Sequence, residues 1–383
     1  MNEENSLRLG VVGATGLFAP TYLNAAMDLS ELDLCAVAAR REEPLKEIAA
    51  SHGSPDIHTD WRELVARDDL DVVAVVTNNA AHHPISIAAL RSGKHVICEK
   101  PLANTTDEAA EMASVAAASS CGHAVGHYMR FAEPVRTVRA LISAGDIGDV
   151  QAIFGRIWQP RALHEPLQWW MTPEECPAGA LGLLGVHLLD LARYLSGSEI
   201  SSVVAHLPVV VGERPDLGAI ARSDANRWSE KHPEGAPEGT PWAAVTASDF
   251  GTIHGEFFSG GLFTFTAGQT TFTRPGPTPD LQVHGSRGSA FVKLGGSNRR
   301  AGSVSLVRGV DSEVYDVPVV SHASARVQNA AMFRDYVIPG LRARAAGEPH
   351  DMASFQDGVA IARVIDAAQE SQRTRAWVDV QSS

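Results

Sequence analysis

The sequence predicts an α/β protein of two domains: a doubly wound parallel sheet, followed by an α/β domain with a large, open-faced, mainly antiparallel sheet. Residues 7–127 alternate between short apolar strands and helical segments, which is the pattern of a parallel sheet covered by helices on both faces. Residues 245–317 carry short alternating strands between glycine turns, which is typical of an antiparallel sheet with one exposed face. At 383 residues the chain is long enough to bury two cores.

The elements of the first domain follow one another at short intervals. We expect strands at residues 7–12, 32–39, 71–77, 95–99 and 123–127, separated by helices at 17–29, 42–52, 60–67, 83–92 and 106–119. The β-branched run DVVAVVT at 71–77 predicts a strand that is buried on both faces. We place the domain boundary near residue 126, which gives domains 1–126 and 127–383.

The second domain has a less regular pattern. Its expected elements are a helix at 134–144, a strand at 150–158, a helical segment at 181–195, the strands of 245–317, helices at 326–346 and 354–371, and a last strand at 376–380. Residues 212–244 form a polar insertion rich in proline and glycine. So long a loop in a compact domain is typical of a lid, an interface arm or a disordered segment.

The composition excludes several classes of partner. The formal net charge is −13 at pH 7, and an acidic surface repels nucleic acids and anionic membranes. The four cysteines show no spacing typical of metal ligands, so we expect free thiols, no bound metal and a reducing compartment. No apolar run reaches the roughly 18 residues of a membrane span, and the N-terminal stretch has no signal-peptide pattern. We therefore expect a cytoplasmic protein.

The first strand leads into the turn VGATGLFAP at residues 12–20. Glycine at positions 13 and 16 lets the backbone turn tightly and approach a pyrophosphate, and the next helix offers free N–H groups and its positive dipole end. The spacing departs from G-x-G-x-x-G, because Thr15 stands at the second glycine position. We favour a dinucleotide site formed by Gly13, Thr15, Gly16 and Leu17 over an ordinary strand–helix turn.

Two arginines follow the second strand, where an acidic residue would bind the ribose of NAD. Arg40 and Arg41 come directly after Ala39, and guanidinium groups bind a 2′-phosphate through charge-assisted, forked hydrogen bonds. The alternative is that they form solvated ion pairs with Glu42 and Glu43. We predict NADP as the cofactor, with NAD as the less favoured choice.

The strand at 95–99 runs into Glu99, Lys100 and Pro101. The carboxyl ends of parallel strands are where doubly wound sheets bind ligands. A lysine beside a glutamate is well placed there as an acid/base group next to a nicotinamide. Taken alone, the pair would more often be an ordinary surface ion pair.

Several segments resemble one family of oxidoreductases. TNNAAHHP at 77–84 and GKHVICEKPL at 93–102 resemble the T-P-N-x-x-H and G-K-H-V-x-x-E-K-P-L signatures of the glucose–fructose oxidoreductase/inositol dehydrogenase/MocA (Gfo/Idh/MocA) family. The similarity continues through VGHYMRFAEP, GALGLLGVHLLDLARYL and SFQDGVAIARVIDAAQ, so it covers nearly the whole chain. It implies an N-terminal Rossmann domain, oligomerisation through the exposed face of the second domain's sheet (as a homodimer or homotetramer), and nicotinamide-dependent chemistry on a sugar, cyclitol or related polyol.

The resemblance also implies roles for individual residues. The residues on the cofactor side are Thr77, Asn79, His82, Glu99 and Lys100. Lys100 is the implied catalytic lysine, and His187 matches the histidine of the family's D-x-G-x-H motif. Leu183 replaces the aspartate of that motif, which puts the family's usual proton relay in doubt. Tyr128 stands where the family often has asparagine; its phenol can contact a sugar hydroxyl and relay a proton, or it is a packing residue.

These assignments predict the substrate pocket. Its lining residues are expected to be Lys100, Tyr128, Arg156, Trp169, Trp170 and His187. The tryptophan pair offers apolar faces to a sugar ring, although such a pair is also typical of core or interface packing. Asp190 lies one helical turn after His187 and can fix the tautomer of its imidazole. The candidate catalytic residues are therefore Lys100, His187 and Tyr128.

The leading hypothesis is an NADP-dependent oxidoreductase that transfers a hydride between the nicotinamide and a hydroxyl- or carbonyl-bearing carbon. One alternative is a redox-neutral elimination or epimerisation of a sugar derivative, in which transient oxidation acidifies a neighbouring carbon. Another is a non-catalytic NADP-binding sensor, although the retained Glu99–Lys100 pair argues against it.

Overall fold

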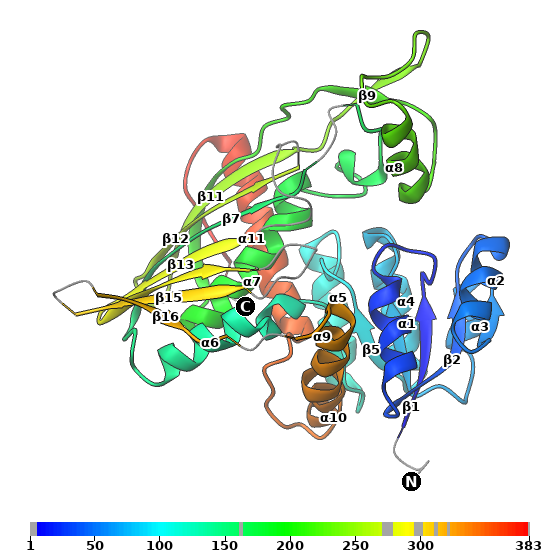
Figure 1. Cartoon of the computed structure of the whole chain (residues 1–383), viewed down its shortest axis with the longest axis horizontal. Coiled ribbons are helices and arrows are strands. Elements are labelled where there is room, and N and C mark those ends of the chain that lie inside the picture. Colours follow the sequence, from blue (N-terminus) through cyan, green and yellow to red (C-terminus); the bar gives the residue numbers. More distant parts are fainter. Residues whose placement is uncertain are drawn as a thin grey trace. The chain divides into compact units, whose positions relative to one another are not determined.

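The computed structural model describes residues 6–160, 164–269, 279–294, 302–309, 313–319 and 322–381. The chain divides into two compact units, neither of which is one continuous stretch (Figure 1). The first unit consists of residues 1–128 and 322–362, and the second of residues 129–321 and 363–383. The predicted boundary at residue 126 lies beside the first break. Residues 322–362, which the prediction assigned to the second domain, belong to the first unit.

In the part of the first unit that the structure describes, six parallel strands form one sheet in the order β3-β2-β1-β4-β5-β6. The strands are β1 (Leu7–Val12), β2 (Leu32–Ala38), β3 (Asp56–His58), β4 (Val72–Val75), β5 (His95–Cys98) and β6 (His123–Val125). The helices between them are α1 (Ala19–Asp28), α2 (Glu42–Ser51), α3 (Trp61–Val65), α4 (Asn79–Arg91) and α5 (Thr106–Ala118). These elements confirm the predicted doubly wound sheet. The short strand β3 was not predicted.

Local sequence accounts for these elements. All four residues of β4 are buried, as expected for a central strand covered on both faces. The side chain of Thr105 caps α5 by accepting a hydrogen bond from the backbone N–H of Glu108 at 3.2 Å, which satisfies a donor left over at the start of the helix. The strand order reverses between β1 and β4, so the carboxyl ends of these two strands border the crevice where doubly wound folds bind ligands.

Residues 322–362 return to the first unit as a mainly helical segment. It contains α9 (Ala325–Met332), a π-helical stretch (Phe333–Val337), α10 (Ile338–Ala345) and the start of α11 (Phe355–Thr374). The side chain of Asn329 donates a hydrogen bond to the carbonyl of Thr21 on α1 at 2.7 Å. The carbonyl of Ala353 accepts one from the N–H of Val125 on β6 at 2.9 Å. The segment is therefore bound to both α1 and β6.

The second unit is built on a mixed sheet. Nine of its described strands pair in the order β16-β15-β14-β13-β7-β12-β11-β8-β17. They are β7 (Val150–Trp158), β8 (Ile200–His206), β11 (Phe250–Phe257), β12 (Leu262–Gly268), β13 (Asp280–Gly285), β14 (Gly288–Lys293), β15 (Ser303–Arg308), β16 (Glu313–Val317) and β17 (Val378–Asp379). Neighbouring strands are antiparallel except for the parallel pair β7–β12, which confirms the predicted mainly antiparallel sheet.

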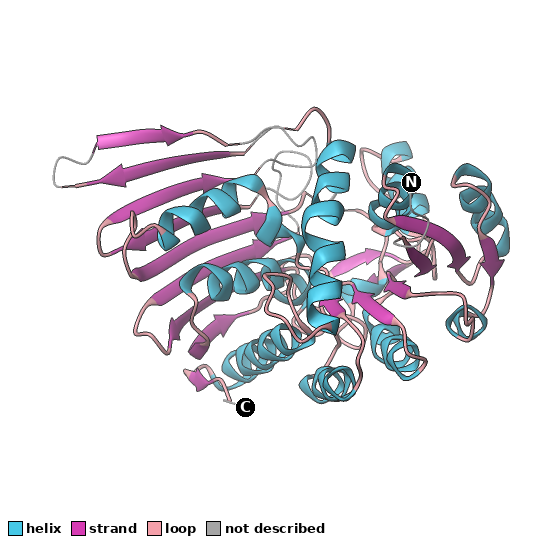
Figure 2. Cartoon of the chain, turned by 90° about the horizontal axis from the view of Figure 1, so that it is seen from below, coloured by secondary structure: helices cyan, strands magenta, loops and turns pink. Residues whose placement is uncertain are grey.

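In the part of the second unit that the structure describes, helices cover one face of this sheet and leave the other open (Figure 2). The helix α6 (Glu133–Ser143) contacts β14 and β15, and α7 (Val186–Ser196) contacts β7. Along β7, Ile153 and Ile157 are buried, whereas Phe154 and Arg156, on the opposite side of the strand, are exposed. This alternation places the core of the unit between the sheet and its helices.

The predicted insertion at 212–244 has secondary structure of its own. It contains a two-stranded ribbon formed by β9 (Glu213–Pro215) and β10 (Trp242–Ala244), with α8 (Arg222–Lys231) between them. The carbonyl of Pro215 accepts a hydrogen bond from the N–H of Leu167 at 2.8 Å. The guanidinium carbon of Arg222 lies 4.8 Å from the ring centroid of Trp170. The insertion is thus fastened to the segment around residues 167–170.

All four cysteines are free thiols, as predicted. Cys98, Cys121 and Cys176 are buried, and Cys35 is partly buried. Across the described ranges, no helix is long and apolar enough to cross a membrane, and no group of three or more histidine, cysteine, aspartate or glutamate side chains is placed to hold a metal ion.

Candidate active site

Most of the predicted cofactor-side residues lie at one edge of the parallel sheet in the first unit. Gly13 follows β1, Thr77 follows β4, Glu99 follows β5, and Tyr128 comes shortly after β6. Because these strands are parallel, their carboxyl ends meet at the same edge. The loops there therefore carry the residues that can bind a ligand.

The turn after β1 requires glycine for two reasons. Gly13 has φ +91°, and a Cβ at this position would lie 2.3 Å from the carbonyl oxygen of Val76. At Gly16 a Cβ would lie 3.0 Å from the carbonyl oxygen of Gly13. The helix α1 begins only at Ala19, so Thr15 and Leu17 belong to the loop, where the Leu17 side chain is exposed. This cradle of backbone, free of side chains at its closest points, fits a pyrophosphate group.

The two arginines after β2 are available to a ligand. Arg40 and Arg41 are exposed, and within the described part of the chain neither forms an ion pair. The carboxylates of Glu42 and Glu43 instead contact Lys46, at 3.0 and 2.9 Å. The alternative interpretation of the arginines as partners of these two glutamates is therefore wrong.

Of the three motif residues after β4, His82 has the clearest contacts. Its Nδ1 lies 2.8 Å from the carbonyl oxygen of Pro101, and its Nε2 lies 3.3 Å from that of Thr77. Burial lowers the pKa of His82 to about 4, although the two carbonyls oppose this shift. His82 and Asn79 are both buried. His82 thus links the loop after β4 to the loop after β5, so we expect any contribution to cofactor binding to be indirect.

Glu99 is the centre of a buried hydrogen-bonded group. The hydroxyl of Tyr22, on α1, donates to Glu99 Oε1 at 2.9 Å, and the hydroxyl of Tyr128 donates to Tyr22 Oη at 2.8 Å. The backbone N–H of Lys100 points to Glu99 Oε2 at 3.3 Å. Burial raises the pKa of the Glu99 carboxyl group, while the Lys100 charge and the Tyr22 hydrogen bond oppose this rise. Three polar side chains from distant parts of the sequence thus meet beside the predicted catalytic lysine.

Lys100 also lies close to the glycine turn. Only 7% of Lys100 is exposed, and its Nζ lies 5.6 Å from the ring centroid of Phe18. An ammonium group at this distance from an aromatic face is attracted by the ring. The acid/base candidate and the phosphate-binding candidate therefore belong to one local site rather than to separate surface features.

In the second unit, His187 lies on α7 directly after a π-helical segment (Leu181–Gly185). Such segments are frequent at functional sites. The glycines of this segment permit close packing, since a Cβ on Gly182 would lie 2.2 Å from the carbonyl oxygen of Pro177. Leu183 packs against a buried apolar cluster consisting of Trp170, Met171, Cys176 and Val245. Position 183 therefore supplies an apolar contact and no proton acceptor.

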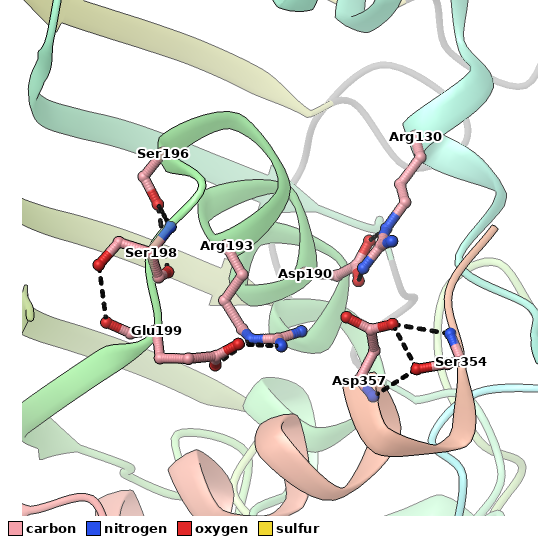
Figure 3. Close-up of polar contacts among 8 residues, drawn as sticks. All are labelled: Arg130, Asp190, Arg193, Ser196, Ser198, Glu199, Ser354 and Asp357. Carbon is pink, nitrogen blue, oxygen red and sulfur yellow. Dashed lines mark hydrogen bonds and ion pairs between the residues drawn. The ribbon is translucent and has the colours of Figure 1, made fainter. Parts of the chain in front are cut away.

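Asp190, on the same helix, has a different partner from the one the sequence suggested. Its two carboxylate oxygens accept hydrogen bonds from Arg130, at 2.8 Å from Nε and 2.5 Å from Nη2 (Figure 3). Both side chains are buried, with exposures of 6% for Arg130 and 1% for Asp190. This buried ion pair, rather than the orientation of His187, is the role that the structure gives Asp190.

The remaining predicted substrate residues have different surroundings. Arg156 is on the open face of the sheet, where its Nη2 lies 2.7 Å from the carboxylate of Asp280. Trp170 is 4% exposed and belongs to the apolar cluster, which supports the packing interpretation. Trp169 is 37% exposed and meets Trp170 edge to face, at 5.5 Å between ring centroids. Of the pair, Trp169 is the one that offers a face to a ligand.

The structure also adds residues that the sequence did not single out. Tyr22, Phe18 and Gly126 all contact or border the Glu99–Lys100 pair. Tyr22 and Glu99 are 77 residues apart, and no local pattern indicates such a contact. Gly126 could have been identified from the sequence, because it comes directly after a strand at the sheet's carboxyl edge.

Comparisons with known proteins agree with this geometry. Residues 7–127 match the model of an oxidoreductase family with an NAD-binding Rossmann fold, and residues 135–291 match the GFO/IDH/MocA C-terminal domain. A levoglucosan dehydrogenase of Pseudarthrobacter phenanthrenivorans is 27% identical over 90% of this chain and 88% of its own length.

Two further comparisons concern the cofactor. A solved levoglucosan dehydrogenase in complex with NADH and L-sorbose superimposes with a TM-score of 0.83 at 25% identity, covering 98% of this chain and 99% of the other. A scyllo-inositol 2-dehydrogenase (NADP(+)) of Bacillus subtilis is 35% identical over 30% of this chain and 34% of its own length. The similar proteins are thus named for both nicotinamide cofactors.

Proposed function

Because the chain belongs to the Gfo/Idh/MocA family of oxidoreductases, we propose that it transfers a hydride between a nicotinamide cofactor and a hydroxyl- or carbonyl-bearing carbon of a sugar, cyclitol or related polyol. The observation that carries the proposal is the buried Glu99–Lys100 pair at the carboxyl edge of the parallel sheet, beside the glycine turn. A lysine held there can exchange a proton with the substrate oxygen. The names of the levoglucosan and inositol dehydrogenases support this substrate class.

In this proposal, the residues of the first unit have separate roles. The backbone of Gly13, Thr15, Gly16 and Leu17 holds the pyrophosphate, and Thr77 and Asn79 line the loop next to it. The bound nicotinamide supplies the hydride acceptor or donor. Lys100 and the half-buried Tyr128 both contact the reacting oxygen, and either side chain can give or take its proton. Such groups must lie within hydrogen-bond reach of that oxygen.

We propose NADP as the preferred cofactor, on the basis of Arg40 and Arg41. Both guanidinium groups are exposed at the end of β2, and the neighbouring glutamates contact Lys46 instead. A 2′-phosphate placed at this point would receive charge-assisted hydrogen bonds from them.

We also propose roles for His187 and Trp169, which belong to the second unit. His187 follows the π-helical segment and matches the histidine of the family motif, so we propose it as a further acid/base group. Trp169 keeps an exposed ring, and we propose that it packs against a sugar ring.

A redox-neutral elimination or epimerisation is the second candidate function, and Leu183 favours it. The apolar packing of Leu183 removes a proton acceptor from the family's usual motif, which would alter how protons are handled after a transient oxidation. Product formation without a net change in nicotinamide absorbance would distinguish this reaction from simple dehydrogenation.

The test is a panel of sugars, cyclitols and their keto forms, assayed with NADP(H) and NAD(H) in parallel. Lys100→Ala should lower kcat by about 100-fold or more in a protein that still binds NADP, while Lys231→Ala, at an exposed lysine on α8, should have no effect. An unchanged biological output from Lys100→Ala, with intact NADP binding, would instead indicate the sensor function.

We further propose a cytoplasmic location and a homodimer or homotetramer. The four free thiols support a reducing compartment. The open face of the second unit's sheet supports self-association, because exposed side chains on its central strand β7 include Phe154.

A further inference from the structure

We propose that Tyr22 is the middle member of a proton path that leads from Tyr128 to the carboxylate of Glu99. The inference rests on the proposed function, since it requires a substrate hydroxyl at Tyr128. Tyr22 is not part of any motif in the sequence, and its side chain is fully buried, with 0% exposure. Two hydrogen bonds connect the three residues: Tyr128 to Tyr22 at 2.8 Å, and Tyr22 to Glu99 Oε1 at 2.9 Å.

The direction of these hydrogen bonds follows from the chemistry of the groups. An ionised carboxylate can only accept, so the single proton of the Tyr22 hydroxyl is directed at Glu99. Tyr22 Oη is then an acceptor toward Tyr128, whose own proton is directed at it. Both protons therefore point toward Glu99, which is the polarity needed to move a proton inward from Tyr128.

Only one member of the path is partly exposed. Tyr128 is half-buried, whereas Tyr22 and Glu99 are buried. The ring of Phe333 packs against both tyrosines, with centroid distances of 5.5 Å to Tyr22 and 5.9 Å to Tyr128. Water is therefore kept from the inner hydroxyl, and a proton entering at Tyr128 passes along the two phenols.

The titratable groups around Glu99 favour its carboxylate as the final proton acceptor. They are Tyr22 from α1, Tyr128 after β6, Cys98 on β5, and Lys100 next to Glu99 itself. Burial raises the pKa of Glu99, so the carboxylate is a better proton acceptor than an exposed one. Burial also raises the pKa of both tyrosines well above its ordinary value, so neither phenol is left as a phenolate.

The proposed step balances in protons and electrons. During oxidation, the substrate O–H bond breaks and its proton goes to Tyr128 Oη, while the Tyr128 proton moves to Tyr22 Oη and the Tyr22 proton to Glu99 Oε1. One O–H bond is lost on the substrate and one is formed on Glu99. The hydride from the substrate carbon would go to the nicotinamide cofactor of the proposed function. Leu183 offers no carboxylate to take this proton.

The first test uses Tyr22→Phe, which removes the hydroxyl and keeps the ring that packs on Phe333. Infrared difference spectra of the cofactor-free protein, with Glu99→Gln identifying the band, report the protonation of Glu99. Loss of a hydrogen bond to the charged form should move the titration midpoint of Glu99 up by about one pH unit. Tyr315→Phe, at an exposed tyrosine on β16, should leave it unchanged.

The second test asks whether the path carries a proton during turnover. In the native enzyme kcat should fall at acid pH, where Glu99 takes up a proton in the substrate complex. In Tyr22→Phe, kcat should fall by about 10- to 100-fold and lose this pH dependence, with an unchanged KM. The Tyr22→Phe/Glu99→Gln double variant should be no slower than Glu99→Gln alone.

Either of two results would overturn the proposal. One is an unchanged Glu99 titration in Tyr22→Phe, and the other is additive losses of kcat in the double variant. The outcome for the proposed function is separate, because it depends on Lys100→Ala. If Lys100→Ala kept full activity while Tyr22→Phe still shifted the Glu99 titration, the hydrogen-bonded chain would stand and the proposed role of Lys100 would fail.

Discussion

At the scale of single residues, Gly126 determines where the Glu99 carboxyl group lies. A Cβ at Gly126 would lie 3.0 Å from Oε2, 3.1 Å from Cδ and 3.2 Å from Oε1 of Glu99. A Cβ would require the carboxyl group to shift by a few tenths of an ångström, and its hydrogen bonds with Tyr22 and the Lys100 backbone oppose that shift. The missing side chain at position 126 is thus a requirement of the site.

We therefore predict that Gly126→Ala displaces Glu99. Overpacking of this kind costs about 1–3 kcal/mol of unfolding free energy, to be measured by urea denaturation, and kcat should fall because the displacement distorts the Tyr22–Glu99 hydrogen bond. Gly212→Ala is the matched control, since a Cβ at Gly212 would meet nothing within 4 Å. A variant with native stability and native kcat would contradict the prediction.

Arg40 and Arg41 give a prediction about cofactor choice. Replacing both with alanine removes hydrogen bonds to a charged group, each worth about 1.5–3 kcal/mol. The Kd for NADP should rise at least tenfold while the Kd for NAD stays within about twofold, as measured by fluorescence titration of the two cofactors. Arg62→Ala, at an exposed arginine on α3, is the control. A native enzyme that prefers NAD would refute the argument from these arginines.

At the scale of elements, His82 joins two loops that carry site residues. Its imidazole contacts the carbonyls of Thr77 and Pro101, and burial lowers its pKa to about 4. Burial likewise lowers the pKa of His123, on β6, to about 4. In the unfolded chain both imidazoles take up a proton below about pH 6.5, whereas in the folded protein they remain neutral until about pH 4.

This difference in proton uptake between the folded and unfolded states makes the free energy of unfolding depend on pH. Between about pH 6.5 and 4 the unfolded state binds more protons, so the free energy of unfolding must fall as the pH is lowered. For His82, which is 1% exposed, the full loss is on the order of 3 kcal/mol. Below pH 4 these two groups cause no further loss.

His82→Gln should therefore flatten the decline in stability between pH 6.5 and 4. At pH 7.5 the variant should be less stable by about 1 kcal/mol, because one hydrogen bond is lost. Urea denaturation at several pH values measures both effects. Ile85→Val, in the buried core on the same helix, is the control, since its cost of about 1 kcal/mol should be the same at every pH. An equal pH slope in His82→Gln and the native protein would refute the prediction.

The same elements show what the sequence could and could not predict. Strands such as β4 were predictable because a strand buried on both faces must be apolar along its whole length. The strand β3 and the ribbon β9–β10 were missed because each strand has only three residues, too few to show a period. The equally short β6 was predicted from its place at the end of the strand–helix alternation. Within the site, the glycine turn and the Glu99–Lys100 pair carry local signatures. The contacts of Tyr22 and His82 depend on partners brought near by the fold.

At the scale of the whole molecule, the path of the chain also could not be predicted. A helical pattern at 326–346 shows that a helix forms there, but it does not show which core the helix covers. The structure assigns residues 322–362 to the first unit, through the contacts of Asn329 with Thr21 and of Ala353 with Val125. Both units are therefore discontinuous in sequence, and truncation after residue 128 would leave the first unit without α9 and α10.

The open face of the second unit's sheet leads to the last prediction. Phe154 and Phe291 are 38% and 39% exposed, and the ring of His284 lies between them, at centroid distances of 5.6 and 5.9 Å. Arg156 lies on the same face, and its charge is matched by Asp280. A row of exposed rings with balanced charge is typical of the buried centre of a protein interface.

We predict that this face is the interface of a homodimer, or one interface of a homotetramer. Phe154→Glu combined with Phe291→Glu would place two charges in the centre of the interface, so the protein should become a monomer of 40.8 kDa in light scattering after size exclusion, with unchanged circular dichroism. Phe258→Glu is the control, because Phe258 is 63% exposed but lies in the turn after β11 rather than on the face. A native protein that is already monomeric at micromolar concentration, or a double variant that keeps the native mass, would show that the face has no such role.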